Sequence, residues 1–192
     1  MKIACLGDSN TFGTYLEAAD AYPSQLQHIL ETRFPQHLYE VKSFGRCGAR
    51  AGHGNIRYID DKQYRQAISY GARLNIIMLG TNDALSGPIP IRETFEAGLM
   101  EVVESVRRGV PGCAVMLVQP PGCKAGRCSQ YLHSVIFPGV QTVAKSANAP
   151  LVQADLVPNV AYSQDMVHLS HRGAEIIAEV VAGALVEFVN GQ

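Results

Sequence analysis

The sequence predicts an α/β fold in which a parallel sheet of five strands carries helices on both faces. Three observations lead to this prediction. Short apolar segments alternate along the chain with longer segments of helical periodicity. One apolar segment, residues 74–79, is almost continuously hydrophobic, as is typical of a strand buried on both faces. No repeat or linker interrupts the alternation, and a length of 192 residues favours one domain over residues 1–192.

The first part of the chain predicts two strands with a helix between them. Residues 2–6 are apolar and rich in strand-compatible residues, and the turn Gly7-Asp8-Ser9 follows them. Pro23 suits the first position of a helix, and apolar residues then recur at helical spacing as far as the next proline. Residues 38–44 are predicted as the second strand, and their two charged side chains favour the edge of the sheet.

The middle of the chain contains the strongest strand signal. Residues 45–54 are glycine-rich, and a helix over residues 56–70 is expected to end at Gly71. The buried strand 74–79 comes next and ends at Gly80-Thr81-Asn82-Asp83, from which we expect a loop to run to residue 90.

The last part of the chain repeats the alternation. A helix with one apolar face ends near Gly109, and strands are expected at residues 114–118 and 151–154. Between these strands, a helix over residues 129–148 should be interrupted at Pro138-Gly139. The last helix is expected over residues 170–190, with Ser170 as its N-cap.

Composition excludes several classes of partner. The formal net charge is −1 and no basic cluster dominates, so we expect no nucleic-acid partner. No apolar run approaches the roughly 20 residues of a membrane-spanning helix, and no secretory signal is recognised, so a cytoplasmic location is expected. Five cysteines without an export signal favour reduced thiols, although Cys123 and Cys128 could close a small disulfide loop. A zinc site at Cys123, Cys128 and His133 would lack a fourth ligand, so no metal is expected.

Polar residues follow four of the predicted strands and should meet at one edge of the sheet. Ligands of parallel α/β folds bind outside the carboxyl ends of the strands. Ser9, the glycine-rich segment and Asn82 follow the first three strands, and Asp165 and His168 follow the last.

These side chains have the composition of a nucleophilic hydrolase site. Ser9 needs a base, which His168 can supply, and Asp165 can hold the imidazole in the required tautomer. The N–H of Ser9, a glycine N–H and the amide of Asn82 are candidate donors to an oxyanion. His171 is a rival base, and Asp165 with His168 could instead cap the last helix.

Four sequence blocks together resemble the SGNH (GDSL-type) hydrolases. The blocks are Gly7-Asp8-Ser9, residues 43–48, Gly80-Thr81-Asn82-Asp83 and Asp165-Met166-Val167-His168, in the order of that family. The resemblance implies a three-layer α/β/α sandwich with a flavodoxin-like sheet of five parallel strands. It also implies Ser9, Asp165 and His168 as the catalytic residues, and Ser9, Gly48 and Asn82 as the oxyanion hole.

The chain departs from the family pattern at three places. Asn10 replaces the leucine of the GDSL group, which we expect to lie outside the chemistry, and Ser43 stands where the second block often has asparagine. Met166-Val167 and Leu169 replace the commoner residues around the histidine. Cys47 has no partner base in the sequence and is expected to be inert.

The function predicted from these residues is a serine esterase that works through an acyl-enzyme without a metal or organic cofactor. Its substrate is expected to be a small ester with a short acyl group, and an acetyl ester is favoured because residues 84–90 and 119–129, the expected pocket walls, are modest loops. A lysophospholipase, thioesterase or acyltransferase of the same family is the alternative. A phosphate- or nucleotide-binding module using Arg46, Arg50 and Arg57, or a relative that binds an ester or glycan without catalysis, is less favoured.

Overall fold

The computed structural model describes residues 1–52, 54–85, 91–154 and 161–190 of the chain. Five parallel strands form one sheet in the order β2-β1-β3-β4-β5. The strands are β1 (Lys2–Gly7), β2 (Glu40–Gly45), β3 (Leu74–Met78), β4 (Ala114–Gln119) and β5 (Leu151–Gln153). The α/β prediction is therefore confirmed, including the flavodoxin-like strand order and the edge position of residues 40–45.

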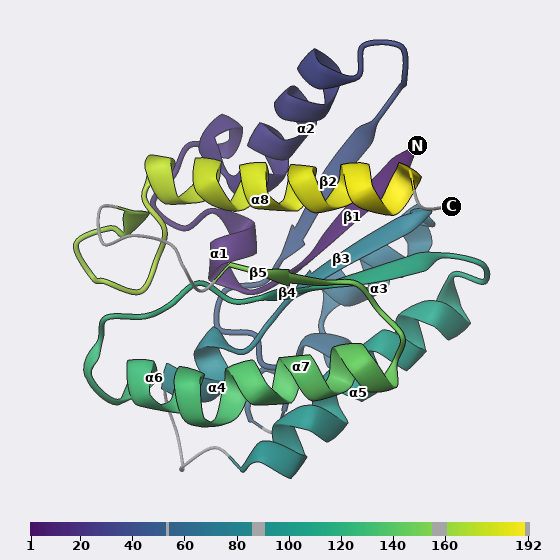
Figure 1. The fold of residues 1–192 in the computed structure, drawn as a ribbon. Helices are drawn as coiled ribbons and strands as arrows, with labels where there is room; N and C mark the ends of the chain where they lie inside the picture. Colours follow the sequence, from purple (N-terminus) through teal and green to yellow (C-terminus); the bar gives the residue numbers. More distant parts are fainter. Residues whose placement is uncertain (53, 86–90, 155–160, 191–192) are drawn as a thin grey trace.

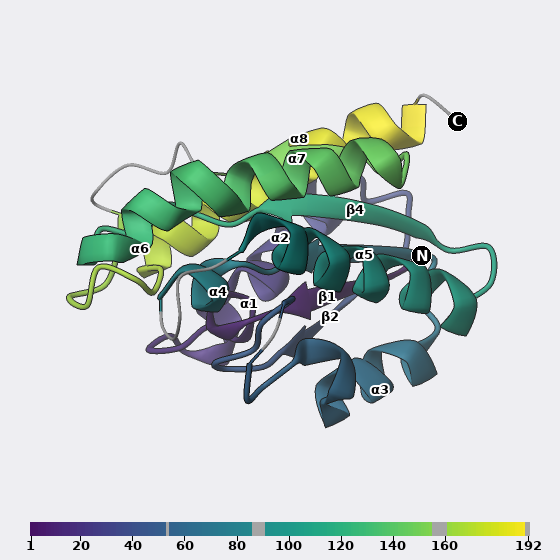
Figure 2. The ribbon, with the colours of Figure 1, turned by 90° about the horizontal axis from the view of Figure 1, so that it is seen from below.

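Helices cover both faces of the sheet and complete three layers (Figure 1). On one face lie α2 (Tyr22–Arg33) and α8 (His171–Asn190), which pack against each other and carry an ion pair between Arg33 and Glu179. On the other face lie α3 (Lys62–Tyr70), α5 (Arg92–Gly109) and α7 (Phe137–Ser146). Figure 2 shows α5 and α7 side by side, where Arg92 donates to Thr142 Oγ1 at 2.9 Å.

Two hydrophobic cores, one on each face, hold these layers together. Leu6, Ile77 and Leu117 point into the core beneath α5 and α7. Ile76 and Met116 point into the core beneath α2 and α8. Successive residues of β3 thus alternate between the two cores, which explains why its sequence is apolar at nearly every position.

Three of the strands end at the same level. Gly7, the last residue of β1, pairs with Gly45 of β2 and with Met78 of β3. A Cβ atom on Gly45 would lie 2.2 Å from the backbone nitrogen of Phe12, so only glycine permits the chain after β1 to cross this strand end so closely. The segments that follow β1, β2 and β3 are therefore brought together at one edge of the sheet.

Several predicted elements differ from the structure in detail. The turn at Ser9 is a short helix, α1 (Ser9–Phe12), and the segment after β3 forms another, α4 (Thr81–Leu85). Local hydrogen bonds stabilise such single-turn helices, and they are too short for a periodicity signal. The helix predicted over residues 56–70 is a 3-10 turn, Tyr58–Asp60, followed by α3, because Asp61 caps the latter by accepting the N–H of Gln63.

The helix predicted over residues 129–148 begins earlier and is not broken at Pro138. It consists of α6 (Gly126–Tyr131), a π-helical segment (Leu132–Ile136) and α7. The wider π turn lies directly before Pro138, which lacks an N–H and would crowd the preceding turn of a regular helix. Two helix boundaries are as predicted. Ser170 precedes the first residue of α8, and its Oγ atom accepts the N–H of Gly173. Gly71 ends α3 with a φ of +64°.

Candidate active site

Ser9 is the first residue of α1 and lies directly beyond the end of β1. Asp8 caps this helix, since its Oδ1 atom accepts the N–H of Asn10 at 2.9 Å. Gly13 ends the helix with a φ of +86° and donates to the Ser9 carbonyl. The Ser9 side chain is thereby held at the carboxyl edge of the sheet, and the residue is only 4 % exposed.

His168 lies within hydrogen-bonding distance of Ser9 on one side and of Asp165 on the other. Its Nε2 atom is 2.9 Å from Ser9 Oγ, and its Nδ1 atom is 2.5 Å from Asp165 Oδ2. A carboxylate beside Nδ1 requires the proton on that nitrogen, which leaves Nε2 to accept the Ser9 hydroxyl proton. The structure thus brings together the three side chains that the sequence suggested as nucleophile, base and acid.

Asp165 is held by hydrogen bonds from its own loop. Its Oδ1 atom accepts the N–H groups of Val167 and His168, each at 2.9 Å, and the Ser163 hydroxyl at 2.7 Å. Burial alone would raise the pKa of Asp165, but the bonds from His168, Val167 and Ser163 hold the pKa well below its usual range. Asp165 therefore stays ionised throughout the neutral pH range.

The loop after β2 carries Gly48 and lies beside α1. Arg46 N–H donates to the Gly7 carbonyl at 2.9 Å, and Cys47 Sγ is 3.3 Å from Thr14 Oγ1. Gly48 has a φ of +78°, a conformation that favours glycine. Among the described residues, the backbone N–H groups of Ser9 and Gly48 donate to no backbone carbonyl outside the helices and strands.

Two neighbouring residues of α4 hold this loop. Asn82 Nδ2 donates to the Ala49 carbonyl at 3.1 Å, which uses one of its two amide hydrogens. Asp83 accepts the N–H groups of Ala51 and Gly52 at 3.1 and 2.8 Å. The side chain of Asn82 therefore lies beside the loop that carries Gly48. Asp83 holds the same loop by accepting from Ala51 and Gly52.

One polar contact near the nucleophile was not anticipated from the sequence. Asn10 Oδ1 accepts the backbone N–H of Leu169 at 3.0 Å, and Asn10 is 3 % exposed. The expectation that Asn10 lies outside the chemistry stays a prediction, but its side chain links the segment of Ser9 to the residue after His168. The available signal was an amide at a position where the GDSL group carries a leucine.

The alternative candidates lie elsewhere or are otherwise engaged. His171 is exposed and lies 3.2 Å from Asp20, on the first turn of α8. Arg46 pairs with Asp61, and Arg57 pairs with Asp60 and Glu101, so two of the three arginines of the supposed phosphate site neutralise carboxylates.

The described part of the chain contains neither a disulfide between Cys123 and Cys128 nor a cluster of metal-ligating side chains. Cys123 and Cys128 are both free thiols, and the Cys123 thiol together with burial raises the pKa of Cys128. Within the described residues, no group of three or more His, Cys, Asp or Glu side chains gathers as a metal site.

Among the helices that the structure describes, none has the length and apolar character needed to span a membrane. Of the expected pocket walls, residues 86–90 lie outside the described residues.

Comparison with known proteins identifies the family. Residues 5–176 match the model of the GDSL-like Lipase/Acylhydrolase family. The chain belongs to this family. Membership places it among the hydrolases of ester bonds, and the matched region contains every predicted site residue.

Individual relatives of this GDSL-like hydrolase agree with the assignment. An acetylxylan esterase of Xylanibacter ruminicola is 26 % identical over 212 residues, which cover 96 % of this chain and 43 % of that protein. The chain thus spans less than half the length of this relative.

Solved structures share the fold. LAE5, an α/β hydrolase from the metagenome of Lake Arreo in Spain, has a TM-score of 0.76 at 19 % identity and covers 95 % of this chain and 94 % of its own. An acetyl xylan esterase from Geobacillus stearothermophilus has a TM-score of 0.75 at 18 % identity, with 95 % and 93 % coverage.

Proposed function

We propose that this family member is a serine esterase that removes short acyl groups, above all acetyl groups, through an acyl-enzyme. The observation that carries the proposal is the continuous hydrogen-bonded series from Asp165 through His168 to the Ser9 hydroxyl. Such a series activates a serine that would otherwise be a poor nucleophile. No step of this chemistry draws on a metal or an organic cofactor.

In the first half of the reaction, Ser9 Oγ attacks the ester carbonyl and His168 Nε2 takes its proton. Ionised Asp165 stabilises the resulting imidazolium through Nδ1. When the tetrahedral intermediate collapses, the bond to the alcohol oxygen breaks and His168 returns the proton to that oxygen. The alcohol leaves, and the acyl group stays on Ser9.

In the second half, water repeats the attack on the acyl-enzyme. His168 Nε2 accepts a proton from the water, and then gives it to Ser9 Oγ as the carboxylic acid leaves. Both halves need donors for the negative carbonyl oxygen. We assign this role to the N–H groups of Ser9 and Gly48 and to the second amide hydrogen of Asn82.

Two observations support an acetyl ester as the substrate. The relatives described above include acetylxylan esterases from two organisms. The described elements also contain no large insertion over the site, since the strands alternate with the helices of the sheet layers. A small acyl group and an alcohol site open to solvent suit this arrangement.

The test is hydrolysis of p-nitrophenyl acetate, butyrate and octanoate by the wild type and by Ser9→Ala. We expect the rate to fall with acyl length, and Ser9→Ala to lower turnover about a million-fold. A fluorophosphonate should label the wild type but not Ser9→Ala. His168→Ala should be equally inactive, whereas His171→Ala, the matched control, should keep wild-type turnover. An unlabelled, inactive wild type would refute the serine mechanism, and an active His168→Ala would refute the assignment of the base.

A further inference from the structure

Tyr15 has a backbone conformation that is unfavourable for an aromatic residue. It lies in a turn closed by the hydrogen bond from the Leu16 N–H to the Gly13 carbonyl, and its φ is +69°. Turns with a positive φ at this position usually carry glycine or asparagine, and a bulky side chain there costs about 1 kcal/mol or more. A small residue would satisfy the turn better, so the tyrosine ring calls for another explanation.

The ring projects into solvent beside the catalytic histidine. Tyr15 is 74 % exposed, although tyrosine is usually at least half buried. Its ring meets that of His168 edge to face, with centroids 5.3 Å apart and planes at 83°. One face of the tyrosine is therefore free to contact a ligand next to the imidazole.

The reaction geometry determines which part of a substrate reaches this ring. The carbonyl oxygen must point toward Gly48 and Asn82, whereas the alcohol oxygen must lie near His168 Nε2 to receive its proton. The alcohol part thus leaves the site on the His168 side. A hollow of about 400 Å³ lies on that side and is lined by Tyr15, Ser163, Gln164 and Asp165.

We propose that this hollow is the alcohol subsite, and that Tyr15 stacks on a sugar ring of an O-acetylated carbohydrate. The proposal rests on the serine esterase function given above. A pyranose presents apolar C–H groups on its face and hydroxyls around its edge. The exposed ring of Tyr15 matches the face. The exposed amide of Gln164 matches the edge, as does the oxygen of Ser163, which can still accept while its hydrogen is donated to Asp165. A lipid or aryl alcohol offers no hydroxyl groups to the Gln164 amide.

The experiment compares kcat/KM for an O-acetylated xylobiose with kcat/KM for methyl acetate, which is too small to reach the hollow. Wild type, Tyr15→Gly, Tyr15→Ala and Tyr15→Phe are measured. Tyr15→Gly is the decisive variant, since glycine adopts a φ of +69° without strain and the fold should not suffer. Leu38→Ala, at an exposed residue before β2, is the control for loss of a large apolar side chain.

We expect the ratio of the two kcat/KM values to fall about five- to tenfold in Tyr15→Gly and Tyr15→Ala. It should stay within about twofold in Tyr15→Phe, which keeps the ring, and should not change in Leu38→Ala. Calorimetric binding of xylobiose without acetyl groups should weaken by a similar factor in Tyr15→Gly. This second measurement requires no turnover.

The outcomes separate the two proposals. If both esters slow by the same factor in Tyr15→Gly, with unchanged xylobiose binding, Tyr15 acts only on His168 and the carbohydrate subsite is refuted. A wild type that cleaves methyl acetate but does not cleave the carbohydrate ester also refutes the carbohydrate subsite, and leaves the serine esterase function standing. A wild type without activity or serine labelling refutes the serine esterase itself.

Discussion

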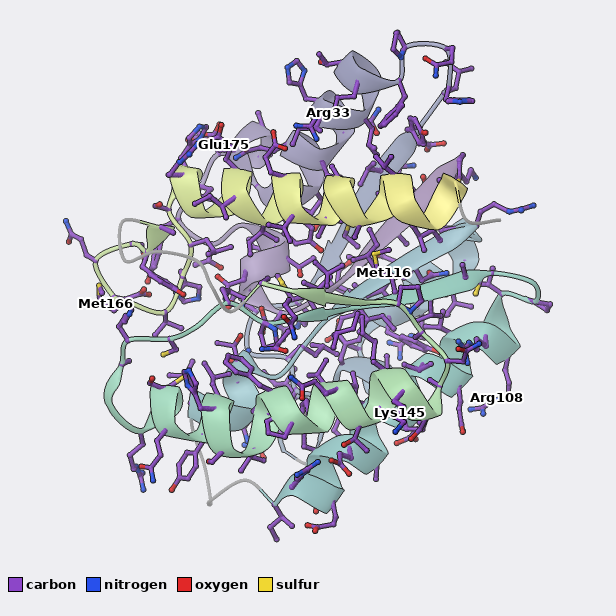
Figure 3. The ribbon with its side chains drawn as sticks, in the orientation of Figure 1. Arg33, Arg108, Met116, Lys145, Met166 and Glu175 are labelled. Atoms are coloured by element: carbon purple, nitrogen blue, oxygen red, sulfur yellow. The ribbon has the colours of Figure 1, made fainter. Side chains whose placement is uncertain are left out.

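Asn10 accepts the backbone N–H of Leu169 through its side-chain oxygen, at a distance of 3.0 Å. The two residues directly follow Ser9 and His168, so this one bond ties the segment of the proposed nucleophile to the segment of the proposed base. A second bond, from the Lys124 N–H to the Met166 carbonyl at 2.9 Å, holds the base segment from the loop after β4. Met166 lies at the end of the molecule that is opposite Arg108 and Lys145 (Figure 3).

Replacing Asn10 by leucine should separate catalysis from folding. The Leu169 N–H would lose its acceptor and His168 would be less well aligned with Ser9, so we expect kcat to fall about 10- to 100-fold with KM within about twofold. The unfolding free energy should fall by about 1–3 kcal/mol, the cost of an unsatisfied buried group. Steady-state kinetics and urea denaturation test both effects, and a variant with wild-type kcat would show that the bond is only structural.

Asp165→Asn should cost about 10⁴-fold in kcat. The amide can still accept from Val167 and His168, so the loop is retained, but it favours the wrong imidazole tautomer and cannot stabilise an imidazolium. Single-turnover acylation with p-nitrophenyl acetate measures this step directly. A loss below tenfold would mean that His168 does not depend on this carboxylate.

Asn82→Ala should lower kcat about 100- to 1,000-fold while the protein remains folded. The substitution removes one proposed oxyanion donor together with the bond to the Ala49 carbonyl. Asp83 continues to bind the Ala51 and Gly52 N–H groups, so the loop after β2 should keep its place. Asn82→Ala with full activity, measured beside its melting temperature, would remove this side chain from the oxyanion hole.

Asp8→Asn should change how stability depends on pH. Asp8 is 1 % exposed, and burial raises its pKa from 3.8 to about 6 despite the hydrogen bond from Asn10. A raised carboxyl pKa means that the folded state binds more protons than the unfolded state between about pH 4 and pH 6. The wild type therefore loses unfolding free energy as pH rises through this window, up to about 3 kcal/mol, and the loss is complete above it.

Asparagine caps a helix as well as aspartate and does not titrate, so subtracting the two pH profiles isolates this group. The unfolding free energy of Asp8→Asn minus that of the wild type should increase between pH 4 and pH 6 and level off above. A difference that is constant with pH would mean that folding does not raise the pKa of Asp8.

Local signals in the sequence predicted the fold well. The apolar residues of β3, the N-cap Ser170 and the helix-ending Gly71 act through their immediate neighbours, so their pattern determines their structure. The site residues could be named because each follows a strand in a parallel sheet and because four sequence blocks resemble the SGNH (GDSL-type) hydrolases. Their catalytic roles stay predictions.

Contacts between distant segments could not be predicted. Asn10 and Leu169 are 159 positions apart, and Asp83 lies 31 and 32 positions from the two residues that it binds. Nothing in the residues around Tyr15 indicates its left-handed conformation, with a φ of +69°. These features depend on tertiary structure and become visible only when the loops are assembled.

The separation of Ser9 and His168 by 159 positions also matters during protein synthesis. The ribosome makes the proposed nucleophile 159 residues before the proposed base. A nascent chain can therefore contain Ser9, Gly48 and Asn82 while it still lacks His168, the group proposed to activate the serine. Unfinished chains, and fragments cut before Asp165, should be unable to form an acyl-enzyme. Covalent labelling of Ser9 should therefore report when residues 165–168 have folded beside it.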